Sequence, residues 1–565
     1  MRKKLIILAV VLFVIAALFA GLGNFLTEYM WFAHLGFGTV FTKVLVARVG
    51  IGVAFGLVAL VVLGIHILLI RKFSKPREDW SISTPEGDID LKSIVGKVTT
   101  PVVVAGAFVV AAIMGYLASR HWEDVLKFFN QSSFGEKEPI LGKDIGFYLF
   151  VLPTMQFVQE WLLYLTGLCA VLSGLVYFAR GALEMDGRLP KMSSQVRGHL
   201  LFALSCIILV VGFGYRVEMF ETLFSKRGVA YGATYTDVTA NLIAYRIMIG
   251  ACAVCAAYLL VLIGSKKEGN AVVKRAGYSL AVVVGLYFLG SFAWPTVVER
   301  LVVKPNQLQK ERKYLEYAIA GTRKAYELDK IESKEFPANA NLEQGQLERN
   351  QATLDNIKIW DHRPLRSTYQ QLQVIRLYYD FPEVDVDRYW VDGRYWQVML
   401  SARELVHEQL PAQSQTWMNI HLQFTHGHGL CLSPVKKTDK EGMPDFWVKD
   451  IPPKSTYDNL KVTRPEIYYG RRTDSFALVK TKMQEFDYPR GKENSYTTYM
   501  GKGGVGIGNF FWRILFAIRF GDADLLFTSQ LTDDSMILFN RNIQERIYTV
   551  APFLMLDQEP YMVVA

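Results

Sequence analysis

The sequence predicts a multi-pass α-helical membrane domain of seven spans in residues 1–300, followed by an α+β extracytoplasmic domain in residues 301–565. Three observations lead to this fold class. Apolar residues make up 51% of the chain and the mean hydropathy is +0.18, both high for a soluble protein. Long apolar runs with almost no charged residues recur as far as Trp294 and then stop. Beyond that point, short alternating runs mix with amphipathic segments, as in a water-soluble α+β domain.

The charge of the chain is divided unevenly between these two parts. Residues 1–303 contain 28 Lys or Arg against 19 Asp or Glu, whereas residues 304–565 contain 34 of each, so the net charge of +9 comes from the first part. A nucleic-acid-binding protein would concentrate basic residues on its soluble part. We therefore expect no nucleic-acid partner and expect the lipid bilayer as a partner.

Seven apolar runs are long enough, or nearly so, to cross about 30 Å of hydrocarbon as a helix. They are Leu5–Ala20, Val49–Ile70, Pro101–Ala118, Trp161–Ala179, Leu200–Gly214, Leu242–Gly264 and Ala276–Trp294. The first run, which follows three basic residues, fits either a span or a secretory signal peptide, and both give the same topology downstream. The last is expected to end at Trp294, because Pro295 interrupts helical hydrogen bonding. An amphipathic helix over residues 306–327, capped by Asn306, is expected to follow.

The basic residues between the spans predict the orientation of the chain in the cell membrane. With a cytoplasmic N-terminus, the inner segments carry 17 Lys or Arg and the outer segments before the last span carry 9. The positive-inside rule favours this arrangement, and an odd number of spans then exports everything after Trp294. The same topology gives two long outer loops, at residues 120–153 and 216–241.

The exported part shows both strand and helix signals. Asp392-Gly393 between two alternating runs predicts a β-hairpin of residues 389–391 and 395–399. Other segments complete the expected α+β pattern: strands at Gln415–Phe424, Phe446–Ile451, Glu466–Tyr469, Ala477–Lys480 and Tyr561–Val564, and helices at Arg363–Tyr379 and Asn509–Phe520. Four of the five cysteines lie in apolar runs and leave Cys431 alone here, so no disulfide framework is expected.

Two ionisable residues fall inside the expected spans. His66 and Arg246 are functional candidates because a charge in hydrocarbon is costly. The structural alternatives are a neutral His66 that hydrogen-bonds to a neighbouring helix and an Arg246 that extends outward to the headgroups.

The exported part contains weak signals for metal binding and catalysis. His421, His426 and His428, with Cys431, are possible zinc ligands, although residues 425–429 also fit a turn at the end of a strand. Asp385 and Asp387 would share one face of a strand, as carboxylates that bind a divalent ion do, but short acidic pairs are common. The glycine-rich segment Gly501–Gly508 fits an anion-binding loop or a flexible turn. No cofactor is expected.

Several stretches together resemble the uncharacterised protein family 0182 of bacterial multi-pass membrane proteins. They include Tyr29–Phe32, Leu35–Phe37, Asp144–Tyr148, Arg227–Val229, Tyr235–Val238, Trp360–Pro364, Tyr378–Pro382, Thr425–Gly427, Arg519–Asp522 and Ala551–Leu554. The resemblance implies seven spans and a large extracytoplasmic domain, and it assigns no catalytic residue. Members of the family continue past the Tyr561–Val564 segment, so we expect a truncated chain in which this segment is an edge strand without its partner.

Three classes of function are compatible with these features. The leading hypothesis is a membrane protein whose exported domain binds a partner or ligand in the cell envelope, such as an envelope protein or a glycan. The second is an envelope enzyme that acts on lipid-linked or glycan substrates through Asp385, Asp387 or His426. The third is a transporter that uses His66 and Arg246.

Overall fold

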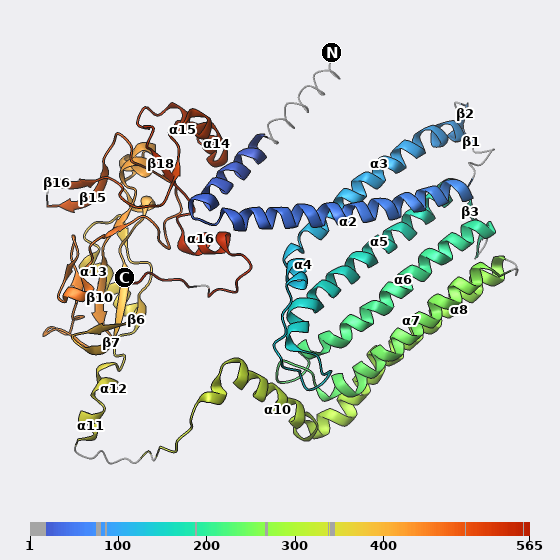
Figure 1. The fold of residues 1–565 in the computed structure, drawn as a ribbon, viewed down its shortest axis with the longest axis horizontal. Coiled ribbons are helices and arrows are strands. Elements are labelled where there is room, and N and C mark those ends of the chain that lie inside the picture. The colour runs from blue at the N-terminus through green and yellow to red at the C-terminus, as the bar shows by residue number, and fades with distance from the viewer. Residues whose placement is uncertain are drawn as a thin grey trace. The chain divides into compact units, whose positions relative to one another are not determined.

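The computed structural model describes residues 19–74, 81–84, 87–186, 189–265, 269–336, 338, 345–491, 493–557 and 559–564. The chain forms two compact units (Figure 1). One, the helical unit, is Lys43–Glu335. The other, the mixed unit, combines Met1–Thr42 with Phe336–Ala565.

Long apolar helices build the helical unit. They are α2 (Gly38–Phe73, which begins in the mixed unit), α3 (Leu91–Ser119), α5 (Leu152–Ala179), α6 (Ser194–Glu221), α7 (Leu242–Ile263) and α8 (Gly269–Tyr287). Helices α5, α6, α7 and α8 pack side by side in chain order (Figure 1). Within the described residues, six helical segments are long and apolar enough to cross a membrane. They contain the last six predicted runs almost completely, whereas residues 5–18 of the first run lie outside the described residues.

Glycine allows two of these helices to approach closely. A Cβ atom at Gly115 of α3 would collide with the carbonyl oxygen of Gly52 of α2, and a Cβ at Gly52 would lie 3.3 Å from the carbonyl oxygen of Gly115. Small residues at such crossings let helix backbones pack where lipid provides no hydrophobic driving force.

The prediction that the helix of the last apolar run ends at Trp294 is wrong. The helical run continues from Gly269 to Ala325, 57 residues in all, through a π-helical turn (Phe288–Ala293), α9 (Trp294–Val297) and a second π-helical turn (Val298–Val303). Pro295 occupies the first turn of α9, directly after the first π-helical turn, where its missing N–H breaks no regular ladder. Helix α10 (Gln307–Ala325) matches the predicted amphipathic helix, but the Asn306 side chain makes no capping hydrogen bond.

Short elements complete the helical unit. They are β1 (Ser81–Thr84), β2 (Gly87–Asp90), α4 (Trp122–Phe129), β3 (Leu183–Asp186) and β4 (Leu189–Met192), with π-helical turns at Phe147–Val151 and Asp237–Asn241 and 3-10 turns at Thr222–Phe224, Lys304–Asn306 and Leu328–Lys330. Strands β1 and β2 form one hairpin, and β3 and β4 form another.

A five-stranded antiparallel sheet lies at the centre of one half of the mixed unit. Its order is β12 (Lys454–Ser455), β11 (Val448–Lys449), β10 (Leu430–Pro434), β7 (Arg394–Ala402) and β6 (Asp385–Val391). The predicted hairpin is confirmed, because β6 pairs with β7 and both turn residues, Asp392 and Gly393, have positive φ. Helix α13 (His362–Gln373) contributes Leu365 and Tyr369 to the core on one face.

The second half of the mixed unit contains a helix from the N-terminal part of the chain. The three-stranded sheet β14 (Ala477–Val479), β18 (Met536–Leu538) and β17 (Val505–Gly506) packs with α14 (Phe510–Phe520) and α15 (Asp524–Phe527). Trp31 and Phe32 of the helix at residues 19–34 belong to the same core, and Trp31 is only 2% exposed. The predicted helix at Asn509–Phe520 is confirmed, with the Asn509 side chain accepting a hydrogen bond from the Phe511 N–H group.

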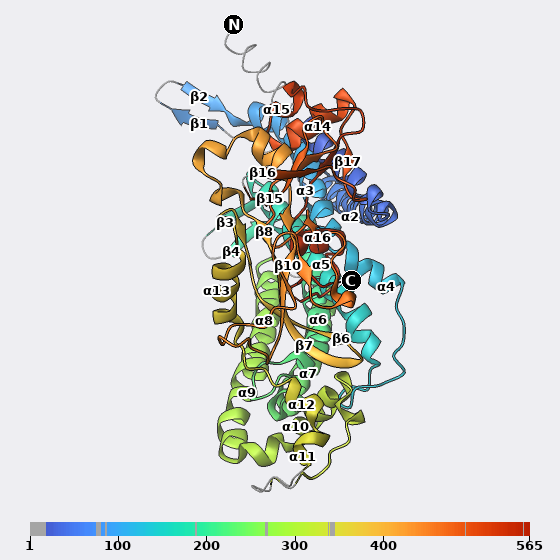
Figure 2. The ribbon, with the colours of Figure 1, turned by 90° about the vertical axis from the view of Figure 1, so that its left-hand side faces the viewer.

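The remaining elements of the mixed unit are short. They are α11 (Gln346–Arg349), α12 (Gln351–Asp355), β5 (Tyr379–Asp380), β8 (Glu404–Leu405), β9 (Gly427–His428), β13 (Glu466–Ile467), β15 (Glu485–Arg490), β16 (Glu493–Thr497) and α16 (Ile543–Val550), with 3-10 turns at His407–Gln409, Ala412–Ser414 and Asp458–Leu460. Strands β5 and β8, β9 and β13, and β15 and β16 form separate antiparallel pairs. Figure 2 shows β15 beside β16.

Two predicted strands are wrong. Residues 417–423 are helical, with a π-helical turn at Asn419–Gln423, so Gln415–Phe424 is not a strand. Residues 561–564 form no strand and have no strand partner among the described residues; the Val564 N–H group instead donates to the Tyr389 hydroxyl at 2.8 Å. The Tyr389 hydroxyl thus accepts the backbone hydrogen bond that a neighbouring strand would otherwise accept from Val564.

Candidate metal centre

Two short strands bring two histidines and one aspartate together in the mixed unit. His428 ends β9, His426 precedes that strand, and Asp487 lies in β15, which contacts β9. The Nδ1 atom of His428 lies 2.9 Å from Oδ1 of Asp487, and the Nε2 atom of His426 lies 3.6 Å from the same oxygen. One ligand atom from each residue lies within 4.8 Å of the other two.

The facing atoms of these three side chains are buried without hydrogen-bond partners. His426 and His428 are each 1% exposed, and His426 Nε2, both ring nitrogens of His428 and Asp487 Oδ1 have no hydrogen bond to the described residues. Although 2.9 Å separates His428 Nδ1 from Asp487 Oδ1, the geometry is not that of a hydrogen bond. A buried polar atom without a partner costs about 1–3 kcal/mol. Several such atoms directed at one point are typical of an ion site.

The spacing of the ligand atoms fits a small divalent ion. Metal–ligand bonds of about 2.0–2.1 Å in tetrahedral geometry place ligand atoms roughly 3.3 Å apart. The two distances to Asp487 Oδ1, 2.9 and 3.6 Å, lie on either side of that value, and the two histidine ligand atoms lie within 4.8 Å of each other. Two imidazoles and one carboxylate suit Zn²⁺ and other divalent transition metals better than Mg²⁺ or Ca²⁺, which prefer oxygen ligands.

A chain of hydrogen bonds behind His426 fixes the orientation of its ring. The Thr425 hydroxyl donates to Oε2 of Glu485 at 2.5 Å, so its oxygen accepts the Nδ1–H of His426 at 2.9 Å. Nε2 is then the nitrogen with the free lone pair, and it faces Asp487. Metal-binding histidines use such a partner on their other nitrogen to fix the tautomer.

Glu485 is held as an acceptor by more than one element. In addition to the Thr425 hydroxyl, its carboxylate accepts hydrogen bonds from the Tyr468 hydroxyl at 2.8 Å and from the Tyr499 N–H group at 2.9 Å. The buried Arg541 guanidinium supports the same region by donating to the carbonyl oxygens of Tyr468 and Thr425. Glu485 therefore acts through Thr425 as a positioning residue.

The titratable groups of the cluster influence one another strongly. Burial favours a lower pKa for His426, but its contacts with the Asp487 and Glu485 carboxylates outweigh burial, so the pKa of His426 is raised and a metal ion at Nε2 would displace a proton. Burial favours a higher pKa for Asp487, but contacts with His426 and His428 lower it well below its ordinary value. Asp487 is thus a carboxylate, the form that binds a metal ion.

The structure separates the other predicted ligands from this cluster. The His421 ring stacks on Phe476 with centroids 3.9 Å apart, and its Nδ1 is hydrogen-bonded to the Phe476 carbonyl oxygen. Cys431 lies in β10, where its sulfur accepts a hydrogen bond from Arg403 at 3.8 Å. Of the expected zinc ligands, His426 and His428 are brought together, and neither His421 nor Cys431 joins them.

The acidic pair and the glycine-rich segment make contacts of their own, away from this cluster. Asp385 and Asp387 lie on the same, partly buried face of β6, and Asp385 is paired with Arg471 at 3.7 Å. In the segment Gly501–Gly508, a Cβ atom at Gly508 would collide with the backbone of Asp533. Gly504 has a φ of +113°, which strains any other residue. Close packing and backbone conformation therefore account for these two glycines.

Asp487 and Glu485 are the residues that sequence reasoning missed. They alternate along β15 in the same way as Asp385 and Asp387 alternate along β6. This alternation could have marked Glu485 and Asp487 as candidates from the sequence. However, no neighbouring residue distinguishes this acidic pair from Asp385 and Asp387. Only the contact between β15 and β9 shows which carboxylate meets the histidines.

His66 and Arg246 occupy different environments in the helical unit. Nδ1 of His66 in α2 lies 2.9 Å from Nε2 of His199 in α6, and Nδ1 of His199 lies 2.7 Å from the Tyr177 hydroxyl of α5. His66 is therefore bonded to a neighbouring helix. His199 lies one residue before the predicted run that starts at Leu200, so it was not among the ionisable residues of the predicted spans. Arg246 is exposed on the surface of α7.

The fold and the cluster define a membrane-type protein with helices apolar enough to span a bilayer and a β-containing C-terminal region that holds a candidate metal centre. The chain belongs to the Uncharacterised protein family (UPF0182), whose family model matches residues 5–565. The family resemblance noted in the sequence is thereby confirmed. No solved structure matches the chain.

Curated relatives in several bacteria support this membership. The chain is 40% identical to a UPF0182 protein of Geobacter sp. (strain M21), covering 98% of this chain and 61% of that protein. It is 39% identical to one of Geotalea uraniireducens (100% and 62%) and 38% identical to one of Desulforamulus reducens (95% and 59%). The chain thus spans about 60% of the length of these relatives.

Proposed function

We propose that this protein is a multi-pass protein of the cell membrane whose mixed unit lies outside the cytoplasm. In this proposal the mixed unit binds a divalent transition-metal ion, with Zn²⁺ as the first candidate. The ligands are His426, His428 and Asp487. The observation that carries the proposal is the convergence of buried ligand atoms that have no hydrogen-bond partner. The ligand of the leading hypothesis is then a metal ion, bound directly or together with an envelope component.

Metal binding is tested on the full chain in detergent after chelation and dialysis. Isothermal titration with ZnCl₂ should show about one site per chain, and His428→Ala should weaken binding by about 100-fold or more because it removes one of three protein ligands. His362→Ala is the matched control, since His362 is an exposed histidine of the same unit outside the cluster. Equal zinc affinity in the parent chain and in His428→Ala would refute the metal centre.

The location of the mixed unit is tested separately. Ser367 is exposed on α13, so a Ser367→Cys variant offers a thiol on the surface of this unit. The excess of basic residues in the inner segments, 17 against 9, supports an extracytoplasmic position. A membrane-impermeant maleimide should label Ser367→Cys in intact spheroplasts, and the parent chain is the background control. Labelling only after lysis would contradict the proposed orientation.

A second candidate is a metal-dependent enzyme of the envelope that acts on lipid-linked or glycan substrates. The observation in its favour is that three protein ligands leave one position of a tetrahedral ion open for water, as in catalytic zinc sites. In such an enzyme, His426, His428 and Asp487 would hold the ion, and Thr425 and Glu485 would orient His426. Hydrolysis of a panel of ester and glycosidic substrates that is lost in Asp487→Asn would support the enzyme, and zinc binding without turnover would favour the binding protein.

A further inference from the structure

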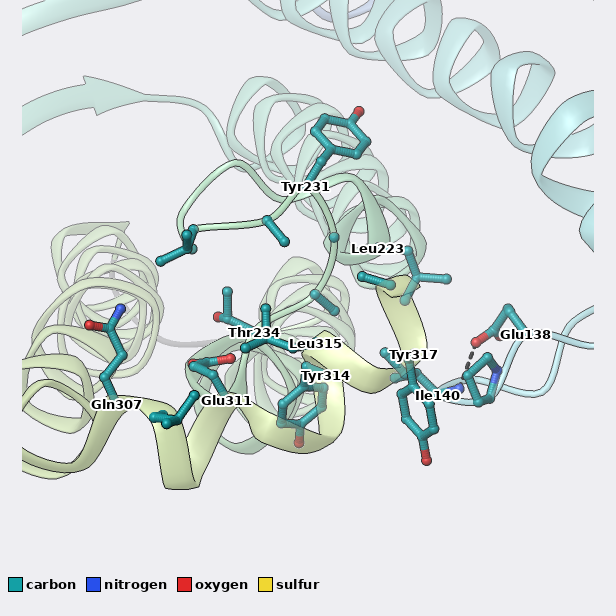
Figure 3. Close-up of a pocket in the computed structure, with 18 residues that line it drawn as sticks. Glu138, Ile140, Leu223, Tyr231, Thr234, Gln307, Glu311, Tyr314, Leu315 and Tyr317 are labelled. Carbon is teal, nitrogen blue, oxygen red and sulfur yellow. Dashed lines mark hydrogen bonds between the residues drawn. The ribbon is translucent and has the colours of Figure 1, made fainter. Parts of the chain in front are cut away.

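The helical unit contains a cavity of about 580 Å³ whose walls are mostly apolar. Figure 3 shows α10 along one side, with Leu315 and Tyr317, and the loop from Leu223 to Thr234 facing it. The volume falls within the range of about 300–1,000 Å³ that is usual for pockets of small ligands. Two lining side chains, Leu308 and Val229, are 76% and 88% exposed, so hydrocarbon surface is accessible within it.

The two carboxylates that line this cavity, Glu138 and Glu311, already accept hydrogen bonds from other groups of the protein. Glu138 accepts hydrogen bonds from the N–H groups of Ile140, Leu141 and Lys143 and from the Tyr148 hydroxyl. Both oxygens of Glu311 accept the Tyr235 N–H group at 3.1 Å. These acidic groups are therefore engaged by the protein itself and leave an aliphatic and aromatic surface for a ligand.

The position of α10 links the cavity to the bilayer. Helix α10 belongs to the same 57-residue helical run as the last apolar segment, and it begins 13 residues after Trp294, where the apolar run ends. Within residues 307–325 there are five Lys or Arg and two Glu, which gives α10 a charge of +3. Lys310 lies over the Tyr235 ring at 5.2 Å and Lys313 over the Tyr317 ring at 5.7 Å, so two ammonium groups lie near the cavity. A basic amphipathic helix beside a membrane is attracted to anionic headgroups.

We propose that this cavity binds one hydrocarbon chain of an anionic phospholipid from the surrounding bilayer, with the phosphate near Lys310 and Lys313. The cavity supplies apolar area for the chain, and the two ammonium groups supply charge of the opposite sign for the headgroup. This site lies in the helical unit, so it is independent of the proposed metal centre.

The test uses the full chain in nanodiscs that contain phosphatidylglycerol with a photoactivatable diazirine at the end of one acyl chain. We expect adducts on peptides that contain Leu308, Leu315 or Val229. Ala318→Trp should reduce these adducts by about tenfold, because Ala318 lines the cavity and an indole would fill it. Ile319→Trp is the matched control, since Ile319 is the next residue of α10, is 55% exposed and is not among the lining residues.

A second arm tests the headgroup. Phosphatidylcholine with the same diazirine chain should label the cavity several-fold less than phosphatidylglycerol, and the double variant Lys310→Gln/Lys313→Gln should remove this difference. Adducts confined to the spans, or equal labelling in Ala318→Trp and Ile319→Trp, would overturn the cavity as a lipid site. Equal labelling by both lipids would overturn the role of the two lysines. Thermal melts of each variant check that the fold is retained.

Discussion

His428 and Asp487 lie on two strands of the mixed unit with Nδ1 and Oδ1 2.9 Å apart, yet no hydrogen bond joins them. If the imidazole simply donated to the carboxylate, the N–H would be directed at the oxygen. Instead, neither atom has a hydrogen-bond partner in the described part of the chain, as is typical of two ligands of one ion. We therefore expect both the stability of the mixed unit and its affinity for a metal ion to depend on these residues.

Metal removal should lower the stability of the protein. An ion that binds only the folded state stabilises it by about 2.7 kcal/mol when its free concentration is 100 times the Kd. Chelation followed by a thermal melt should therefore lower the Tm by several degrees, and added ZnCl₂ should restore it. In Asp487→Asn, which keeps the shape but loses the charge, the Tm should not respond to zinc. A zinc response of parental size in this variant would contradict the assignment of Asp487 as a ligand.

Thr425→Val should weaken metal binding while the fold remains intact. Valine fills the same volume but cannot accept the Nδ1–H of His426 or donate to Glu485, so the His426 ring loses its fixed tautomer. Loss of a group that orients a metal ligand typically reduces affinity by about 10–100-fold. Titration of the chelated protein with zinc measures the change, and Thr425→Ser should recover most of the affinity. Failure of serine to restore binding would point to a packing role for Thr425.

Gly115→Ala should destabilise the helical unit. The added methyl group would collide with the Gly52 carbonyl oxygen, so α2 and α3 must separate. Overpacking of this kind costs about 1–3 kcal/mol. Gly106→Ala on the same helix is the matched control, because nothing lies within 4 Å of a Cβ there. Denaturation in mixed micelles should show a lower free energy of unfolding for Gly115→Ala but not for Gly106→Ala. Equal losses of stability in the two variants would contradict the close crossing of α2 and α3.

The stability contributed by Asp361 should depend on pH. Hydrogen bonds from the Arg363 side chain and backbone lower the pKa of Asp361 from 3.8 to about 2. The folded-state pKa is depressed, so the stabilisation is fully present above pH 3.8 and is lost as the pH falls towards 2. Asp361→Asn keeps a helix-capping side chain but no charge. Urea unfolding should show a lower free energy of unfolding for this variant than for the parent chain at pH 5, and the difference should disappear as the pH approaches 2. A difference that stays constant over this range would contradict a charge-dependent contribution of Asp361.

Local signals predicted much of the fold, and the failures arise where a local feature has no sequence signature or where the contact is distant in sequence. Asp392-Gly393 and Asn509 act within a few residues, so the hairpin and α14 could be located from the sequence. Pro295 misled the prediction because the preceding π-helical turn accommodates it, and that turn has no simple sequence signature. Two ligands of the candidate site, His426 and His428, were visible as a cluster. The third, Asp487, depends on the contact of β9 with β15 across a long stretch of sequence.

The shared core of Trp31 with Phe539 has a consequence for how the protein is made. The mixed unit is discontinuous: a ribosome synthesises its first part, then the whole helical unit, and only then the strands that enclose Trp31. At about 5–20 residues per second, close to 300 intervening residues mean a delay of roughly 15–60 s. During that interval the aromatic side chains of residues 19–42 have no native partner from residues 336–565. A fragment that begins at residue 336 would likewise lack Trp31 and Phe32, so supplying residues 19–42 in trans or by circular permutation is the rational route to a soluble form of this unit.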